Sequence, residues 1–287
     1  MSTNLVVGGV NLSIYGLEEY KSKQENCPVS VIFSLHGRLQ NAEEMTKINT
    51  ALTDLNSKAP RDASSRTHLL VVSFDHVNHG SRLVDNNKNL AWRDTEYDNR
   101  THAMDMWSFQ KSAADTVSLL IDLLEFYIFP EQNTKIVQYG VLGFSLGGHA
   151  SYLASSKDSR LSLCVALVGC ADYEALLKYR ASSMDLPLQA PYLPERFLTN
   201  VVRKLDTIQQ PENLFSIKLL MINGGQDKLV PAKCNTDFVE KVRTSHKGVE
   251  GKDWEWLILP SLGHEWSAEM IQSCTQWCFE WMHNKTM

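Results

Sequence analysis

The sequence predicts an α/β fold in which a mostly parallel sheet is covered by helices on both faces. Two observations lead to this prediction. Six short runs are apolar at nearly every position, as is expected of strands that are buried on both faces. Longer stretches of helical pattern alternate with these runs along the chain, which favours parallel strands joined by helices.

The predicted elements follow one another without an internal repeat. The six strands are expected at residues 29–35, 69–74, 135–142, 161–168, 218–223 and 254–259. Residues 5–15 precede them and fit an antiparallel pair at the edge of the sheet. Helices are expected at residues 42–56, 107–129, 147–156, 233–244 and 265–283. The helix at 107–129 is long and amphipathic, and Pro130 ends it.

Two long segments fit neither pattern. Residues 78–105 are mostly polar, and residues 172–215 carry four prolines between short helical pieces. Loops of this length inside a compact domain are usually lids or binding loops. The length of 287 residues suits one large domain. We therefore predict a single domain over residues 1–287, with a cap or lid insertion at about 172–215 and a long active-site loop at about 78–105.

The composition is ordinary for a globular protein and excludes several function classes. Apolar residues make up 43% and charged residues 21% of the chain. The net charge is −5 and no long run has one sign, so the sequence gives no basis for binding nucleic acid. No window approaches about 18 consecutive apolar residues, so no membrane span is predicted. The N-terminus lacks the pattern of a secretory signal.

The cysteine and histidine spacing argues against a metal site. The six cysteines are scattered, mostly among apolar neighbours, and are expected to be buried free thiols in a reducing, cytoplasmic setting. Asp75, His76, His79 and His102 have no recognised ligand spacing, so no metal ligands are predicted.

A candidate nucleophile lies between a predicted strand and a predicted helix. Residues 143–147 read Gly-Phe-Ser-Leu-Gly, the G-x-S-x-G pattern of a nucleophile elbow. The chain must reverse so sharply at such an elbow that the residues two before and two after the serine need to lack a Cβ atom. Gly143 and Gly147 meet this need, and the predicted nucleophile is Ser145. A glycine-rich turn with an incidental serine is the alternative.

A serine hydroxyl needs a base, and the chain offers an acid and a histidine in the required order. Asp227 follows the strand at 218–223, and His264 follows the strand at 254–259. Both positions lie past the carboxyl end of a strand, where open α/β sheets bind their ligands. We expect His264 to act as general base and then general acid, and Asp227 to orient its imidazole. Each residue taken alone fits an ordinary turn.

Two backbone N–H groups are expected to stabilise the oxyanion that forms during acyl transfer. One is the N–H of Leu146, directly after the nucleophile. The other belongs to the loop after the first core strand, His36-Gly37-Arg38, and is assigned to the N–H of Arg38. The alternative is a plain loop between a strand and a helix.

These residues together resemble the α/β-hydrolase superfamily. The matching pieces span most of the chain and are HG at 36–37, D-x-x-x-H-G-S at 75–81, GFSLGG at 143–148, GGQDKLVP at 224–231 and LGHEW at 262–266. The layout is most similar to small carboxylesterases and to single-domain enzymes of the prolyl-oligopeptidase-like or dienelactone-hydrolase-like type. The resemblance implies an eight-stranded, mostly parallel sheet and an acyl-enzyme mechanism without a cofactor.

Two departures limit what the resemblance implies about the substrate. His36-Gly37-Arg38 is not the HGGG motif of one lipase and esterase branch. The elbow holds a serine in place of the cysteine of dienelactone hydrolases. Substrates tied to those two motifs therefore do not carry over.

Several aromatic side chains are candidates for the lining of a substrate pocket. His36, Phe144, Trp92 and Trp266 lie near predicted strand ends or in the long loops, and Phe144 and Trp266 adjoin Ser145 and His264. Core packing would explain the same residues equally well.

The sequence thus predicts a serine hydrolase that cleaves a carboxylic ester or thioester of a small molecule. Hydrolysis of an amide or small peptide is one alternative, and a non-catalytic scaffold that binds a ligand is another. The physiological substrate and the oligomeric state stay open.

Overall fold

The computed structural model describes residues 2–23, 27–58, 67–93, 97–131 and 134–283. Residues 94–96 of the predicted active-site loop lie outside these ranges. None of the helices within the described ranges is long and apolar enough to cross a membrane.

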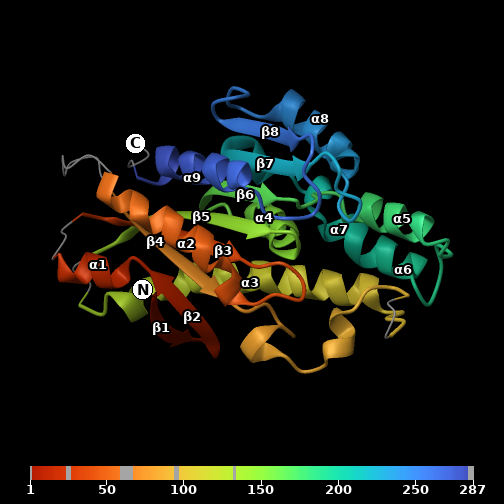
Figure 1. Cartoon of the computed structure of the whole chain (residues 1–287), viewed down its shortest axis with the longest axis horizontal. Coiled ribbons are helices and arrows are strands. Elements are labelled where there is room, and N and C mark those ends of the chain that lie inside the picture. Colours follow the sequence, from red (N-terminus) through yellow and green to blue (C-terminus); the bar gives the residue numbers. More distant parts are fainter. Residues whose placement is uncertain (1, 24–26, 59–66, 94–96, 132–133, 284–287) are drawn as a thin grey trace.

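Eight strands form one sheet in the order β1-β2-β4-β3-β5-β6-β7-β8 (Figure 1). β1 and β2 pair antiparallel, β2 pairs antiparallel with β4, and the remaining neighbours are parallel. The predicted mostly parallel, eight-stranded sheet is confirmed. The strands are Ser2–Val7 (β1), Val10–Tyr15 (β2), Val29–Leu35 (β3), His68–Phe74 (β4), Ile136–Phe144 (β5), Leu161–Leu167 (β6), Lys218–Gly224 (β7) and Trp254–Leu259 (β8).

The two faces of the sheet carry two separate hydrophobic clusters. Successive residues of a strand alternate between them: Val31 and Phe33 of β3 belong to one cluster and Ile32 to the other. Two helices cover the Ile32 face, α2 (Thr46–Thr53) and α9 (Ala268–Met282). The other face is covered by α3 (His102–Ile128), α4 (Leu146–Lys157) and α8 (Thr236–Ser245), and Figure 1 shows α2 and α9 apart from α3. Burial on both faces explains why the strands read as continuous apolar runs.

The other helices differ from their predicted bounds by one to four residues at an end, and two helices depart from the prediction further. α3 begins at His102, five residues before the predicted start, and so takes in the end of the segment predicted as a loop. The residues at its start are polar and therefore resemble a loop in the sequence. In the structure Thr101 donates to Asp105, and the His102 ring donates to Leu90 O. A short helix, α1 (Leu17–Ser22), was not predicted, since six residues carry too little periodicity.

The segment at 172–215 contains three short helices, α5 (Tyr173–Ser183), α6 (Glu195–Phe197) and α7 (Arg203–Leu205), which lie together at one end of the molecule in Figure 1. Its buried side chains, among them Leu176, Leu193 and Val202, belong to the same hydrophobic cluster as the α3 and α4 face of the sheet. Through these side chains the segment packs against the hydrophobic core on that face of the sheet.

Candidate active site

Three strand ends bring the predicted catalytic residues to one edge of the sheet. Ser145 follows β5, Asp227 lies three residues after β7, and His264 lies five residues after β8. β5, β6, β7 and β8 are consecutive parallel neighbours, so their carboxyl ends share an edge. Ser145 and His264, 119 positions apart in the sequence, thus become neighbours through strand pairing.

The chain turns sharply at Ser145. Its φ of 54° and ψ of −111° lie in a region that L-residues rarely adopt. A Cβ on Gly143 would lie 2.1 Å from Gly147 O, and one on Gly147 would lie 2.1 Å from Leu35 O. The two glycines therefore allow β5, α4 and the end of β3 to approach one another and leave the serine at the apex.

Alanine at either of these glycines is expected to destabilise the fold by about 3 kcal/mol or more, because the clash is with backbone atoms that cannot rotate away. Gly143→Ala and Gly147→Ala should both shift urea denaturation to lower midpoints. Gly263→Ala is the matched control, since its Cβ would meet only Glu265 Oε1 at 3.6 Å. Equal midpoints for all three variants would contradict this account of the elbow.

A chain of two hydrogen bonds joins the three side chains. His264 Nδ1 lies 2.7 Å from Asp227 Oδ2, and His264 Nε2 lies 2.7 Å from Ser145 Oγ. An ionised carboxylate only accepts hydrogen bonds, so Nδ1 carries the proton. In the neutral imidazole Nε2 is then the acceptor, and the Ser145 hydroxyl donates to it. This is the tautomer that can take the serine proton.

The three side chains differ in their exposure to solvent. The Asp227 side chain is fully buried, while 18% of the His264 side chain is exposed. Ser145 keeps 9% of its surface exposed. His264 is therefore the most accessible of the three, Ser145 is nearly buried, and the carboxylate is shielded from solvent.

Asp227 is held as a carboxylate by its neighbours. Burial by itself raises the pKa of this carboxyl, but the hydrogen bond from His264 and those from the N–H groups of Val230 and Leu229 outweigh burial, and the pKa lies below its usual value. Both N–H groups donate to Oδ1 at 2.8 Å. The sequence analysis missed these two supporting donors. An aspartate that caps its own turn is the signal that could have revealed them.

The two proposed oxyanion donors lie in segments that pack against each other. Leu146 is the first residue of α4, so its N–H belongs to the first turn and has no acceptor inside the helix. The loop of His36, Gly37 and Arg38 lies against the elbow, because a Cβ on Gly147 would be 2.9 Å from His36 O and one on Gly37 would be 3.2 Å from the Phe144 ring.

Other hydrogen bonds fix the position of this loop. Gly37 N donates to Gln40 Oε1 at 2.8 Å, and the Arg38 guanidinium donates to Asn89 O at 2.6 Å. The loop after β3 is thus anchored to the following turn and to the 78–105 segment.

The four predicted pocket residues divide into two pairs. Phe144 stacks on Trp266 with ring centroids 4.5 Å apart, and its centroid lies 5.7 Å from that of His264. Trp266 also lines a small cavity of about 130 Å³ between α2 and α9. His36 and Trp92 are enclosed, with 0% and 1% of their surface exposed. Of the four, Phe144 lies beside His264, and Trp266 stacks on Phe144.

The enclosed histidines form a packed group next to the loop after β3. His36 Nδ1 contacts Gly37 O at 2.7 Å, while Nε2 accepts from His76 N at 3.0 Å. His76 Nε2 contacts His36 O at 2.8 Å. Burial lowers the pKa of His36 to about 4 and that of His76 well below its usual value, so both are neutral near pH 7. Within the described ranges no three His, Cys, Asp or Glu side chains are placed to hold a metal ion.

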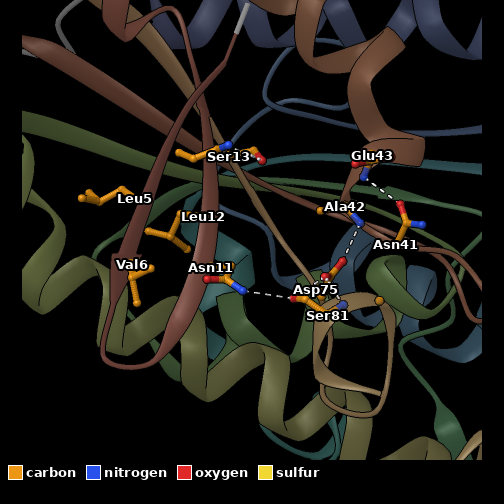
Figure 2. A pocket seen from close by; sticks show the side chains of 12 residues that line it. Leu5, Val6, Asn11, Leu12, Ser13, Asn41, Ala42, Glu43, Asp75 and Ser81 are labelled. Atoms are coloured by element: carbon orange, nitrogen blue, oxygen red, sulfur yellow. Dashed lines mark hydrogen bonds between the residues drawn. The ribbon is translucent and has the colours of Figure 1, made fainter. Parts of the chain in front are cut away.

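A larger groove of about 650 Å³ lies away from the triad, between the β1–β2 hairpin and the turns at residues 41–43 and 80–81 (Figure 2). Neither Ser145 nor His264 lines it. In Figure 2 the Asp75 side chain lies between Ala42 and Ser81, and it accepts hydrogen bonds from Ala42 N, Ser81 N and Ser81 Oγ at 2.7–2.8 Å. Asp75 therefore holds two turns together, and its oxygens are already engaged.

Solved structures of low sequence identity share the fold. Neither a model of a sequence family nor the sequence of a curated protein matches the chain. The protein TT1662 from Thermus thermophilus is 14% identical with a TM-score of 0.67, over 98% of each chain. Est1E from Butyrivibrio proteoclasticus, solved with ferulic acid, is 13% identical with a TM-score of 0.55, also over 98% of each chain. An acylaminoacyl peptidase from Pyrococcus horikoshii is 15% identical with a TM-score of 0.62, over all of this chain and 42% of that one.

The similarity to these structures and the topology of the sheet both indicate the same fold. The chain has the α/β-hydrolase fold that its sequence motifs predicted.

Proposed function

We propose that this chain is a serine hydrolase that cleaves a carboxylic ester or thioester of a small molecule through Ser145, His264 and Asp227. The observation that carries the proposal is the chain of two 2.7 Å hydrogen bonds from serine to histidine to aspartate, in the tautomer that activates the serine. A binding scaffold has no need of a strained serine aligned with a base. The esterases among the structural neighbours support the choice of an ester.

Acylation begins when Ser145 Oγ attacks the carbonyl carbon of the substrate. His264 Nε2 takes the hydroxyl proton, and Asp227 stabilises the resulting imidazolium. The negative charge moves to the former carbonyl oxygen, where the N–H groups of Leu146 and Arg38 would donate hydrogen bonds. The bond to the leaving group then breaks, and His264 returns its proton to the departing alkoxide or thiolate.

Deacylation repeats these steps with water. His264 takes a proton from water as the water oxygen attacks the acyl carbon, and the collapse of the second intermediate releases the acid and the serine hydroxyl. We further propose that residues 172–215 form a cap beside the site. Support comes from α5, whose Arg180 Nε donates to Leu229 O at 3.0 Å, next to the N–H groups that hold Asp227.

Two measurements test the function. We expect a fluorophosphonate probe to label Ser145 in the folded protein, with no labelling after heat denaturation. On matched acyl groups, esters and thioesters should turn over at least about a hundredfold faster than anilides, because an amine is a poorer leaving group. Absence of labelling in the folded protein would favour the non-catalytic scaffold. Faster turnover of the anilides or dipeptides would favour an amide or small-peptide hydrolase.

A further inference from the structure

One arginine occupies a core position beside the triad. The inward face of α5 carries Tyr173, Leu176, Leu177 and Arg180, spaced as one helical stripe. Only 6% of Arg180 is exposed, although its neighbours on the stripe belong to the hydrophobic cluster. Arginine is almost never this buried unless its charge is paired.

The Arg180 side chain makes one hydrogen bond with the residues that the structure describes, and this bond does not involve its terminal nitrogens. Nε donates to Leu229 O. Among the described residues, no carboxylate forms an ion pair with Arg180 and no acceptor bonds to its two terminal nitrogens. These nitrogens are also not among the fully enclosed polar atoms that lack a partner, so they border space that water can enter.

The groups around the guanidinium do not neutralise it by direct contact. Asp227 is near enough for its charge to act on Arg180, but its oxygens already accept from His264, Leu229 and Val230. His149 lies one helical turn after Ser145, and burial together with the charge of Arg180 lowers the pKa of His149 to about 3. A neutral imidazole adds no second cation there. Arg180 thus offers a positive charge and two terminal donor groups that no described residue engages.

We propose that Arg180 binds a carboxylate of the substrate, so that the enzyme acts on esters or thioesters that carry a second, free carboxylate. The proposal rests on the proposed hydrolase function and adds the class of substrate. Terminal guanidinium nitrogens match the two oxygens of a carboxylate in a bidentate pair. One cation suits a monoanion, whereas a phosphate dianion close to the Asp227 carboxylate would keep an uncompensated charge.

A purely structural role makes a different prediction. If Arg180 only braced the Asp227 loop through Leu229 O, its loss would lower turnover of charged and neutral esters alike, because Asp227 serves both. Recognition of a carboxylate changes the ratio between the two. That ratio separates a specificity residue from a positioning residue.

The experiment compares the monomethyl esters of succinate, glutarate and adipate with neutral methyl esters of the same length. In the wild type, kcat/KM should favour at least one half ester by roughly a hundredfold, mainly through KM. Arg180→Gln should reduce that preference about a hundredfold, and Arg180→Lys should restore part of it by restoring the charge without the fork. Lys178→Gln, on the exposed face of the same helix, is the matched control and should keep the preference.

A binding measurement keeps the proposal testable without catalysis. The wild type is titrated in a calorimeter with free succinate, glutarate and adipate. At least one of these dicarboxylates should bind, and its dimethyl ester should not. Fluorophosphonate labelling reports on the hydrolase function by itself, so labelling without dicarboxylate recognition sinks only the present proposal.

Three further results would overturn it. The first is a wild type that turns over half esters and neutral esters equally. The second is an equal loss of both in Arg180→Gln, which would assign the brace role. The third is tighter binding of inorganic phosphate or a phosphorylated ester than of any dicarboxylate or half ester. If Arg180→Gln fails to fold, the substrate preference and dicarboxylate binding of the wild type decide the matter.

Discussion

Ser145→Ala is expected to lower kcat for ester hydrolysis by roughly 10⁵- to 10⁶-fold while the protein keeps its fold. The substitution removes Oγ, which donates to His264 Nε2 and would form the acyl bond. It keeps the Cβ atom, so the strained backbone at φ 54° holds a side chain of nearly the same size. What activity remains would come from substrate binding and the oxyanion donors alone.

Single-turnover kinetics on a chromogenic ester would measure this effect, with denaturation midpoints as the check on folding. Ser156→Ala is the matched control, because it removes a buried serine hydroxyl from α4, the helix that follows Ser145, and this hydroxyl donates to Leu153 O. The control should retain full activity. A Ser145→Ala protein that kept more than a few per cent of wild-type kcat would overturn the assignment of the nucleophile.

Asp227→Asn is expected to lower kcat by about 10⁴-fold. The carbonyl of the asparagine can still accept from Leu229 N and Val230 N, so the turn should persist. Its amide would then face His264 Nδ1 and donate to it. That arrangement leaves Nδ1 unprotonated and places the ring proton on Nε2. Nε2 can then no longer accept the proton of Ser145.

The rate of fluorophosphonate labelling should fall together with kcat, since both need the activated serine. Asp253→Asn offers a control, because it weakens an ion pair with Lys218 at the amino ends of β7 and β8, opposite the ends that Asp227 and His264 follow. An Asp227→Asn variant with near wild-type labelling would show that the aspartate does not set the tautomer. The loss would then require another explanation.

The inner strands of the sheet, such as β3 and β4, were predictable because they are buried on both faces. Burial on two sides requires apolar side chains at most positions, and β3, buried at all its positions, has the predicted bounds 29–35. β8 at the sheet edge also has its predicted bounds, 254–259, although its middle positions are only half-buried or exposed. The start of α3 was not predictable in the same way. Its first turn is specified by two polar contacts: Thr101, just before the helix, donates to Asp105 within it, and the His102 ring donates to Leu90 O. A hydrophobic period does not report such contacts.

The membership of the candidate triad was also readable from the chain. Gly143, Gly147 and the strand before them mark the elbow, and Asp227 and His264 follow the ends of two later strands. Parallel strands in neighbouring positions place such residues at one edge, so their order along the chain is enough to propose them together. The hydrogen bonds between them, and the tautomer these bonds select, required coordinates.

The elbow serine was therefore determined by local sequence, because a strand, a sharp turn and a helix are local patterns. What surrounds it was decided by tertiary structure. Whether His36 and Trp92 are enclosed, and whether Phe144 meets Trp266, depends on segments brought together from distant parts of the chain. Arg180 illustrates the same limit: its helix lies in a proline-rich segment, and only packing shows that a charged side chain there turns inward, beside Asp227, with its terminal donors unused by any described residue.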